Sequence, residues 1–486
     1  MALVALTAPA ELLSLLLPLD QAVLIISSLA AIQGMPFLVL LSRSQSRGRG
    51  CDGELPFFLM TLSVFSHEAY PTLQDGFARV SAIGPRVFPA FCHEADVLAR
   101  DEAYLPGSPM GIAEKGFEGH PSARVRAFVR GFLKTTATGK DVIDFVRDET
   151  RTEVERLERS WTSFGTSVGS LSEVTFILLA LFPVGLEMLG ATVSGFTSSL
   201  LFVGAFGLLA IVAVGFLFLA DAVQPVARDY VPRSAALAAC LAAWASATLA
   251  YYMGVLSSIP YVLVPLLVSL AGVYFTRRHH SRIRKGETEV SALLHDLAEE
   301  SKAGVSLAEA LSKLTGLADQ FRSIREPLLT FYRATQLGST PTEAQRRISH
   351  PSWLVRLGFG ILSIAFETGA GFEHLENLST LFRRVADSRG SVTRSMIPFL
   401  LIGAIVPVIS ISAITFISGL AQAGPVALPG IAVQVNERSL ILSVSTVSLL
   451  SGLLLSKLLT QTVRHIVAMP IVLASTLIAL VAFGVA

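Results

Sequence analysis

The stretch SSIPYVLVPLLVSLAGVYFT (257–276), followed at once by RRHHSRIRK (277–285), decides the fold class of this 486-residue chain. Twenty uncharged, mostly apolar residues are long enough to cross the hydrocarbon core of a bilayer as one helix. The next nine residues include five basic side chains. Lys and Arg next to membrane spans are retained on the cytoplasmic side. The junction at Thr276 therefore predicts a membrane helix that ends in the cytoplasm.

The rest of the chain repeats this contrast between apolar segments and basic polar stretches. Of the 38 Lys and Arg residues, 33 lie in two polar stretches, 42–170 and 277–395. Both stretches are expected on the cytoplasmic side of the cell membrane, with the N- and C-termini outside. The apolar segments predict about eight spans, near 21–41, 171–193, 198–221, 234–255, 257–276, 396–420, 439–458 and 465–486.

These segments define five expected parts of an all-α integral membrane protein. They are an interfacial and first transmembrane helix (1–41), a cytoplasmic helical domain (42–170), four transmembrane helices (171–276), a second cytoplasmic helical domain (277–395) and three transmembrane helices (396–486). Hydrophobic residues make up 52% of the chain and charged residues 15%, which is outside the usual composition of a soluble globular protein.

Charge and cysteine usage exclude two other classes. The first polar stretch has 16 basic and 17 acidic residues and the second has 17 and 13, so neither is a nucleic-acid-binding arm. The three cysteines, Cys51, Cys92 and Cys240, are scattered along the chain. This pattern argues against a disulfide framework and predicts reduced thiols.

The two polar stretches share an internal repeat. GELPFFLMTLSVFSHEAYPTLQDGFARVSAIG resembles ETEVSALLHDLAEESKAGVSLAEALSKLTGLA, and FVRGFLKTTATGKDVIDFVRDET resembles FGILSIAFETGAGFEHLENLSTLF. Each half reads as helix, turn, helix, so two colinear helical domains are expected. The matched positions are Leu73 with Leu307, at an offset of 234 residues, and Gly139 with Gly371, at an offset of 232.

Each domain is expected to join the membrane through a continuous helix. Apolar residues from Val142 to Phe164 recur at steps of three and four, which is the period of a helix with one buried face. This helix is predicted to continue into the span near Leu171. The segment after Gly371 is likewise predicted to lead into the span at 396, so that the domains are coupled rigidly to the membrane helices.

The twofold pattern resembles the type II secretion system F domain of platform proteins in secretion systems, type IV pili and archaella. The resemblance rests on an apolar helix, a small-residue turn such as Ala303-Gly304-Val305-Ser306-Leu307, a second helix, and a Gly-containing turn before the membrane helix. It covers about 290 to 300 residues in two copies. Four spans between the copies and three after the second resemble the archaeal branch, including the tight-adherence-like proteins.

The resemblance implies a scaffold at the base of a filament. In such a platform, the cytoplasmic domains dock on a hexameric secretion ATPase, and the membrane core handles pilin or archaellin subunits. It also implies a homo-oligomer in contact with membrane lipids, with no nucleic acid, no cofactor and no metal. The chain itself is expected not to be an enzyme, because no catalytic residues come with the motif.

Two groups of residues are candidates for contacts. The basic cluster Arg277, Arg278, Arg282, Arg284 and Lys285 is expected to face either the ATPase or anionic lipid. Glu187 lies in the middle of an apolar segment, where a carboxylate is unfavourable unless it is paired or faces a polar cavity. It is a candidate contact within the membrane, and a protonated, hydrogen-bonded group is the alternative.

Sequence motifs for catalysis fail on their spacing. Gly131 precedes the Gly139-Lys140 pair by eight residues instead of five, and Asp141 stands where a phosphate-binding loop needs Ser or Thr. His67-Glu68 and His93-Glu94 lack the second histidine of a zinc protease.

The rival class is a multi-span transporter, for which eight spans and a buried carboxylate are ordinary. Transporters repeat their membrane segments, whereas the repeat found here lies in the polar stretches. An intramembrane protease is disfavoured because the spans contain no paired aspartates and no Ser/His couple.

Overall fold

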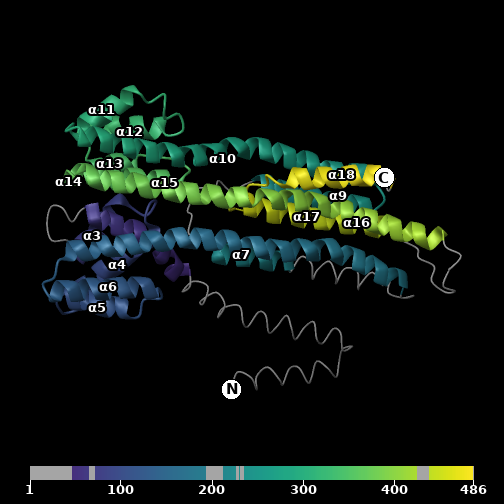
Figure 1. Cartoon of the computed structure of the whole chain (residues 1–486), viewed down its shortest axis with the longest axis horizontal. Coiled ribbons are helices and arrows are strands. Elements are labelled where there is room, and N and C mark those ends of the chain that lie inside the picture. The colour runs from purple at the N-terminus through teal and green to yellow at the C-terminus, as the bar shows by residue number, and fades with distance from the viewer. Residues whose placement is uncertain are drawn as a thin grey trace, which may run out of the picture. The chain divides into compact units, whose positions relative to one another are not determined.

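The computed structural model describes residues 46–64, 72–192, 212–225, 229, 235–423, 437–462 and 464–484. Its regular secondary structure within these ranges is helical, as Figure 1 shows. The chain divides into two compact units, Met1–Thr150 and Arg151–Ala486. The boundary falls inside one helix, α7 (Val142–Thr192), so it separates packing units and does not interrupt the backbone.

The first unit is a bundle of short helices around phenylalanines. The helix of residues 46–64 packs with α3 (Leu73–Ile83), α4 (Pro89–Tyr104), α5 (Pro109–Glu118) and α6 (Ala123–Ala137). Phe58 stacks on Phe91 with ring centroids 4.3 Å apart and lies edge-on to Phe128. Burial of such rings is the main favourable term in folding a small bundle.

The second unit contains a similar bundle. It is formed by α10 (Ser258–Lys302), α11 (Leu307–Gly316), α12 (Arg325–Gln336), α13 (Pro341–Arg346), α14 (Trp353–Thr368) and α15 (Phe372–Ser395). Ser306, Thr340 and Ser352 begin helices by accepting a backbone N–H three residues on. This is the hydrogen bond that an N-cap hydroxyl supplies. α14 is almost wholly buried, with 13 of its 16 residues inside the bundle.

Long helices lead from these bundles into apolar segments. α7 runs for 51 residues without interruption, which confirms the predicted continuation past Leu171. α15 is followed by α16 (Ile397–Ala423) after a single turn residue, Met396, so the predicted connection at 396 is also confirmed. α10 adds a connection that the sequence did not suggest, because it passes from the apolar stretch through Arg277 to Lys302 as one helix.

The apolar helices of the second unit form a bundle with α17 (Glu437–Thr460) at its most buried position. Four segments of the described chain are long and apolar enough to cross a membrane: Ala235–Tyr252 (α9), Ser258–Lys302, Phe372–Ala413 and Ile441–Thr460. Val212–Val223 and α18 (Met469–Ala482) are shorter apolar helices. Two buried clusters join α9, α10, α17 and α18, which Figure 1 shows side by side. The predicted span 21–41 and residues 198–211 of another lie outside the described residues.

Close approach between α17 and α18 depends on a small residue. A Cβ atom at Gly452 would lie 3.0 Å from the Cα atom of Met469, which is backbone and has no freedom to rotate away. We expect Gly452→Ala to force the helices apart and lower the free energy of unfolding by about 1–3 kcal/mol. Thermal unfolding in detergent measures this. Gly215→Ala, at a helical position with open space, is the control. Equal melting temperatures for the two variants would contradict the close contact.

Candidate functional site

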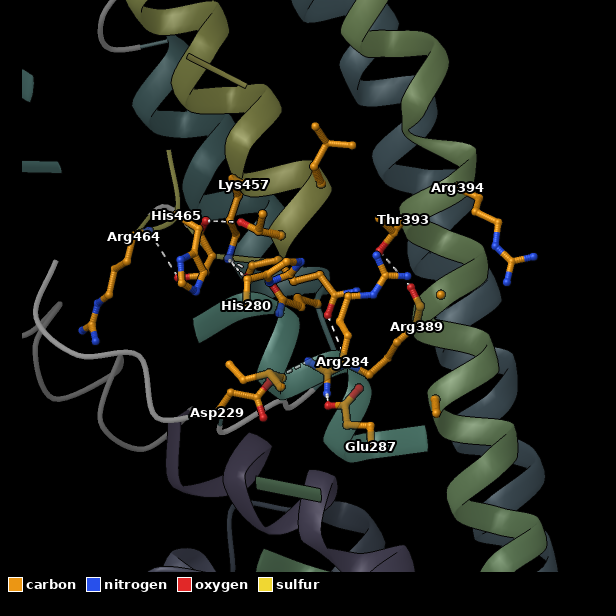
Figure 2. A pocket seen from close by; sticks show the side chains of 18 of the residues that line it. Asp229, His280, Arg284, Glu287, Arg389, Thr393, Arg394, Lys457, Arg464 and His465 are labelled. Atoms are coloured by element: carbon orange, nitrogen blue, oxygen red, sulfur yellow. Dashed lines mark hydrogen bonds and ion pairs between the residues drawn. The ribbon is translucent and has the colours of Figure 1, made fainter. Parts of the chain in front are cut away.

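A polar cavity of about 520 Å³ lies where the apolar helices of the second unit meet its polar bundle. Figure 2 shows most of the side chains that line it. They come from the middle of α10, the last third of α15, the end of α17 with residues that follow it, and Asp221, Gln224 and Asp229. The cavity is therefore placed where four separate parts of the chain leave the apolar bundle.

Arg389 is the centre of this site. α15 buries Leu378, Phe382 and Val385, and Arg389 continues the same helix face one turn later. Its side chain is only 14% exposed. Nη2 donates to Asp229 Oδ2 at 2.7 Å, Nη1 forms a short contact with Glu287 Oε1, and Nε donates to Gln461 Oε1 at 3.2 Å. The guanidinium thus joins α15 to α10, to the 221–229 segment and to the end of α17.

The partners of Arg389 hold further elements. The second carboxylate oxygen of Asp229 accepts the backbone N–H of Trp353 at 2.8 Å, which satisfies a donor at the start of α14. Glu287 also accepts the hydroxyl of Ser352 at 3.5 Å. The indole ring of Trp161 in α7 lies 5.8 Å from the Arg389 guanidinium carbon, within the range of a cation–π interaction. Residues of α7 and α10, together with Asp229 and Gln461, therefore converge on one side chain of α15.

A single guanidinium faces the carboxylates of both Asp229 and Glu287, and the pKa values of these two groups shift in opposite directions. Burial raises the pKa of Glu287 to about 7, more than the charge of Arg389 lowers it, and the nearby Asp229 raises it further. Burial would also raise the pKa of Asp229, but the charge and hydrogen bonds of Arg389 and the Trp353 N–H hold this pKa below its ordinary value. Two unneutralised carboxylates in a buried site repel each other, and the group with the weaker partners takes up the proton.

Lys457 forms a second ionic contact beside the first. It is 5% exposed, near the end of α17, and its Nζ donates to Asp221 Oδ1 at 2.6 Å, to Gln224 Oε1 at 2.8 Å and to the carbonyl of Gln461 at 3.3 Å. Gln461 has φ of 60°, a left-handed conformation that is strained for a residue with a side chain. This conformation ends α17 and lets one residue contact both Lys457 and Arg389.

Two histidines border the same cavity. The rings of His280 and His465 have centroids 5.5 Å apart. Burial lowers the pKa of His280 to about 4, and the charges of Arg284 and Arg389 act in the same direction. Burial and the neighbouring His280 and His279 lower the pKa of His465 to about 4. Both rings are therefore neutral at pH 7.

Part of this arrangement recurs in the first unit, with a matching sequence. SRGRGCDGE (46–54) matches SRIRKGETE (281–289), and HPSARVR (120–126) matches HPSWLVR (350–356). In both units the histidine Nδ1 accepts the serine backbone N–H at 3.1 Å, and the serine hydroxyl caps the next helix. In both, an acidic residue of the first helix accepts from that serine: Asp52 from Ser122 at 2.5 Å and Glu287 from Ser352.

The glycines before the two long helices differ in backbone conformation. Gly139 and Gly369 both have left-handed φ values, 66° and 63°, at the turn before the long helix. Gly371, which was matched with Gly139 from the sequence, has φ of −64° and begins α15. The two glycines matched in the sequence therefore differ in backbone conformation, and Gly369 is the one that shares the left-handed φ of Gly139. Two small-residue turns lie close together there, and sequence letters do not record which glycine adopts the left-handed conformation.

The predicted site residues are divided between two places. Arg284 lines the cavity, whereas Arg277, Arg278, Arg282 and Lys285 line a separate groove on α10. Glu187 lies in the helical part of α7, but its side chain lies outside the described residues. Local sequence patterns did not single out Arg389, Asp229, Glu287 and Lys457. The position of Arg389 on the apolar stripe of α15, and the recurrence of the two motifs, were the available signals.

A cluster in the first unit resembles a metal site in composition. One ligand atom each of Cys51, Glu94 and His120 lies within 4.8 Å of the others. Arg47 forms a bidentate ion pair with Glu94, with both distances 2.7 Å, and His120 Nε2 lies 3.4 Å from the same carboxylate. A guanidinium already compensates the charge that a cation would need, so we interpret this group as a buried ion pair.

Comparison of the chain with protein families, curated proteins and solved structures finds no match.

Proposed function

We propose that this chain is the membrane platform of a type IV filament system, related to the archaellum and archaeal pilus machines. In this proposal, its two polar helical domains receive force from a hexameric secretion ATPase, and its apolar bundle handles pilin or archaellin subunits. The observation that carries the proposal is the recurrence of one sequence and hydrogen-bond pattern in two helix bundles, each continued by long helices into apolar segments.

The helix order supports a duplicated domain. In each unit a helix with the S-R-x-R signature is followed by four shorter helices, the HPS motif lies before the last of these, and a left-handed glycine precedes the long helix. Tandem copies of one helical domain are the feature that resembles the F-domain platform proteins. We therefore propose the duplication as the basis of family membership, together with eight spans and cytoplasmic polar domains.

The junction at Arg389 supports mechanical transmission. A helix is stiff along its axis, but a force is passed on only where the helix ends are fixed to their neighbours. Arg389 fixes the polar helix α15 to Asp229, to Glu287 of α10 and to Gln461 at the end of α17, by contacts that are largely shielded from water. Lys457 ties the end of α17 to Asp221 and Gln224. A push on the bundle then moves the apolar helices as a group. In this proposal the chain is not an enzyme, and ATP is hydrolysed by the partner.

A transporter is the second candidate, favoured by the polar cavity. Arg389 and Lys457, however, are both engaged by carboxylates of the chain itself, which leaves these cations less available to a solute. The recurring motifs lie in the polar bundles and not in the apolar helices. This distribution favours a platform.

Purification of the tagged chain from its native membrane in mild detergent tests the proposal. We expect a secretion-type ATPase and pilin-like subunits to be recovered with it, identified by mass spectrometry. Deletion of the chain should abolish filaments, and the intact gene should restore them. An unrelated tagged multi-span protein is the control for recovery. Normal filaments in the deletion strain, or substrate-dependent uptake into vesicles without either partner, would reject the platform in favour of a transporter.

A further inference from the structure

A groove of about 840 Å³ lies on the second unit, separate from the cavity at Arg389. It lies between α10 and α12, with residues 322 and 323 just before α12. Four of its basic residues belong to the cluster singled out from the sequence, but three come from 322–333. The basic residues that line it are Arg277, Arg278, Arg282, Lys285, Arg322, Arg325 and Arg333.

Most of this positive charge has no counterpart. Glu326, the one acidic residue that lines the groove, pairs with Arg282 at 3.0 Å. Asp319 pairs with Arg325 at 3.2 Å. The other five cations, at positions 277, 278, 285, 322 and 333, have no ion pair or side-chain hydrogen bond within the described part of the chain and are exposed. Five unpaired cations in one groove favour a ligand that is an anion with more than one charge or acceptor oxygen.

The groove begins where the apolar stretch of α10 ends. Tyr274 and Phe275, at the end of the apolar stretch of α10, are 68% and 76% exposed. Aromatic residues in this position mark the membrane–water interface. Arg277 follows directly, and Lys285 is about 12 Å further along the helix, at 1.5 Å per residue. The polar layer on each side of a bilayer is about 5–8 Å thick, so these long side chains reach it.

We infer that this groove binds the headgroup of an anionic phospholipid from the cytoplasmic leaflet. The phosphate oxygens accept from the unpaired guanidinium groups, while Tyr274 and Leu329 contribute apolar lining for the glycerol and upper chain. A surface of an ATPase fits this groove less well than a lipid does, because the groove opens beside the end of a membrane segment. The inference requires only that α10 crosses a membrane, and it does not depend on the filament system. It assigns an orientation to the polar bundle relative to the bilayer.

Native mass spectrometry of the intact chain in detergent tests the site with phosphatidylglycerol as the probe and phosphatidylcholine as the neutral comparison. The test variant carries Arg278→Gln, Arg322→Gln and Arg333→Gln. The matched control carries Arg346→Gln, Arg347→Gln and Arg383→Gln, which remove the same charge from exposed positions elsewhere on the unit. We expect about 100-fold weaker retention of phosphatidylglycerol in the test variant only, since each basic residue near the surface adds about fivefold to such binding.

Four outcomes would overturn the inference. Equal losses in both variants would show a general charge effect, and no loss in the test variant would show that the groove is not used. Inorganic phosphate that binds as tightly as the lipid would indicate a site for a soluble anion. Capture of an acidic protein that depends on Arg278, Arg322 and Arg333, with lipid retention unchanged, would assign the groove to a protein partner. Thermal unfolding of both variants confirms that they remain folded.

Discussion

Replacing Arg389 with methionine is expected to lower the free energy of unfolding by about 3–5 kcal/mol, the cost of removing one partner from a buried ion pair. Methionine retains most of the side-chain volume, so the loss comes from the carboxylates of Asp229 and Glu287, which are left buried without a cation. Gln461 and Trp161 also lose their contacts with the guanidinium. Thermal or denaturant unfolding in detergent, followed by intrinsic fluorescence, measures the change.

Two variants distinguish the loss of this junction from a general effect on the helix. Arg383→Met lies on the same helix with its side chain 80% exposed, and we expect a change below 1 kcal/mol there. Combining Arg389→Met with Asp229→Asn and Glu287→Gln removes the orphaned charges and should recover part of the stability. An Arg389→Met protein as stable as Arg383→Met would show that the junction does not fix the helices.

The general architecture was predictable because it follows from hydrophobicity along the chain. The amphipathic period from Val142 to Phe164 merges into an apolar run, and the helix duly continues to Thr192. The continuity of α10 was missed because its basic cluster resembles a domain boundary. A helix can pass from lipid to water by a change of side chains alone, with its backbone hydrogen bonds intact.

The junction itself was not predictable from local patterns. The sequence does not distinguish Arg389 from the other arginines of α15, which are Arg383, Arg384 and Arg394. In the structure, Arg389 is the one that is buried, at 14% exposure, and bound to two carboxylates. Asp229 and Glu287 precede it by 160 and 102 residues. Their meeting depends on the register in which α10 and α15 pack. The motifs SRxR and HPS were visible in the sequence, and comparing them would have pointed to the two turns that share the histidine–serine hydrogen bond.

Acidification from pH 8 to pH 5 is expected to destabilise the second unit through buried histidines. Besides His280 and His465, burial lowers the pKa of His350 to about 4, reinforced by the charges of Arg282 and Arg356. A histidine with a depressed pKa binds fewer protons folded than unfolded. The stability that each neutral, buried histidine contributes to the folded state is therefore complete above pH 6.5. It is lost as the pH falls toward 4. The loss is on the order of 2 kcal/mol per histidine at pH 5.

Glu287 changes stability in the opposite direction, so it reduces the net loss of stability on acidification. Its pKa of about 7 when folded lies above its ordinary value of 4.5, so its contribution is complete below pH 4.5 and is lost as pH rises through 7. One carboxylate offsets roughly one histidine, which leaves the effect of two histidines, a net loss on the order of 4 kcal/mol at pH 5. In the first unit the depressed pKa of Glu94, about 2, matters only below pH 4.5.

His350→Asn isolates one histidine, because an amide oxygen can accept the Ser352 N–H as Nδ1 does. We expect this variant to lose less stability than the wild type between pH 8 and pH 5, as measured by melting temperature across the range. His295→Asn, at an exposed position on α10, should retain the wild-type slope. A wild-type melting temperature that stays constant or rises on acidification would mean that these rings are not buried neutral. The packing of α10 against the HPS turn and the end of α17 would then need revision.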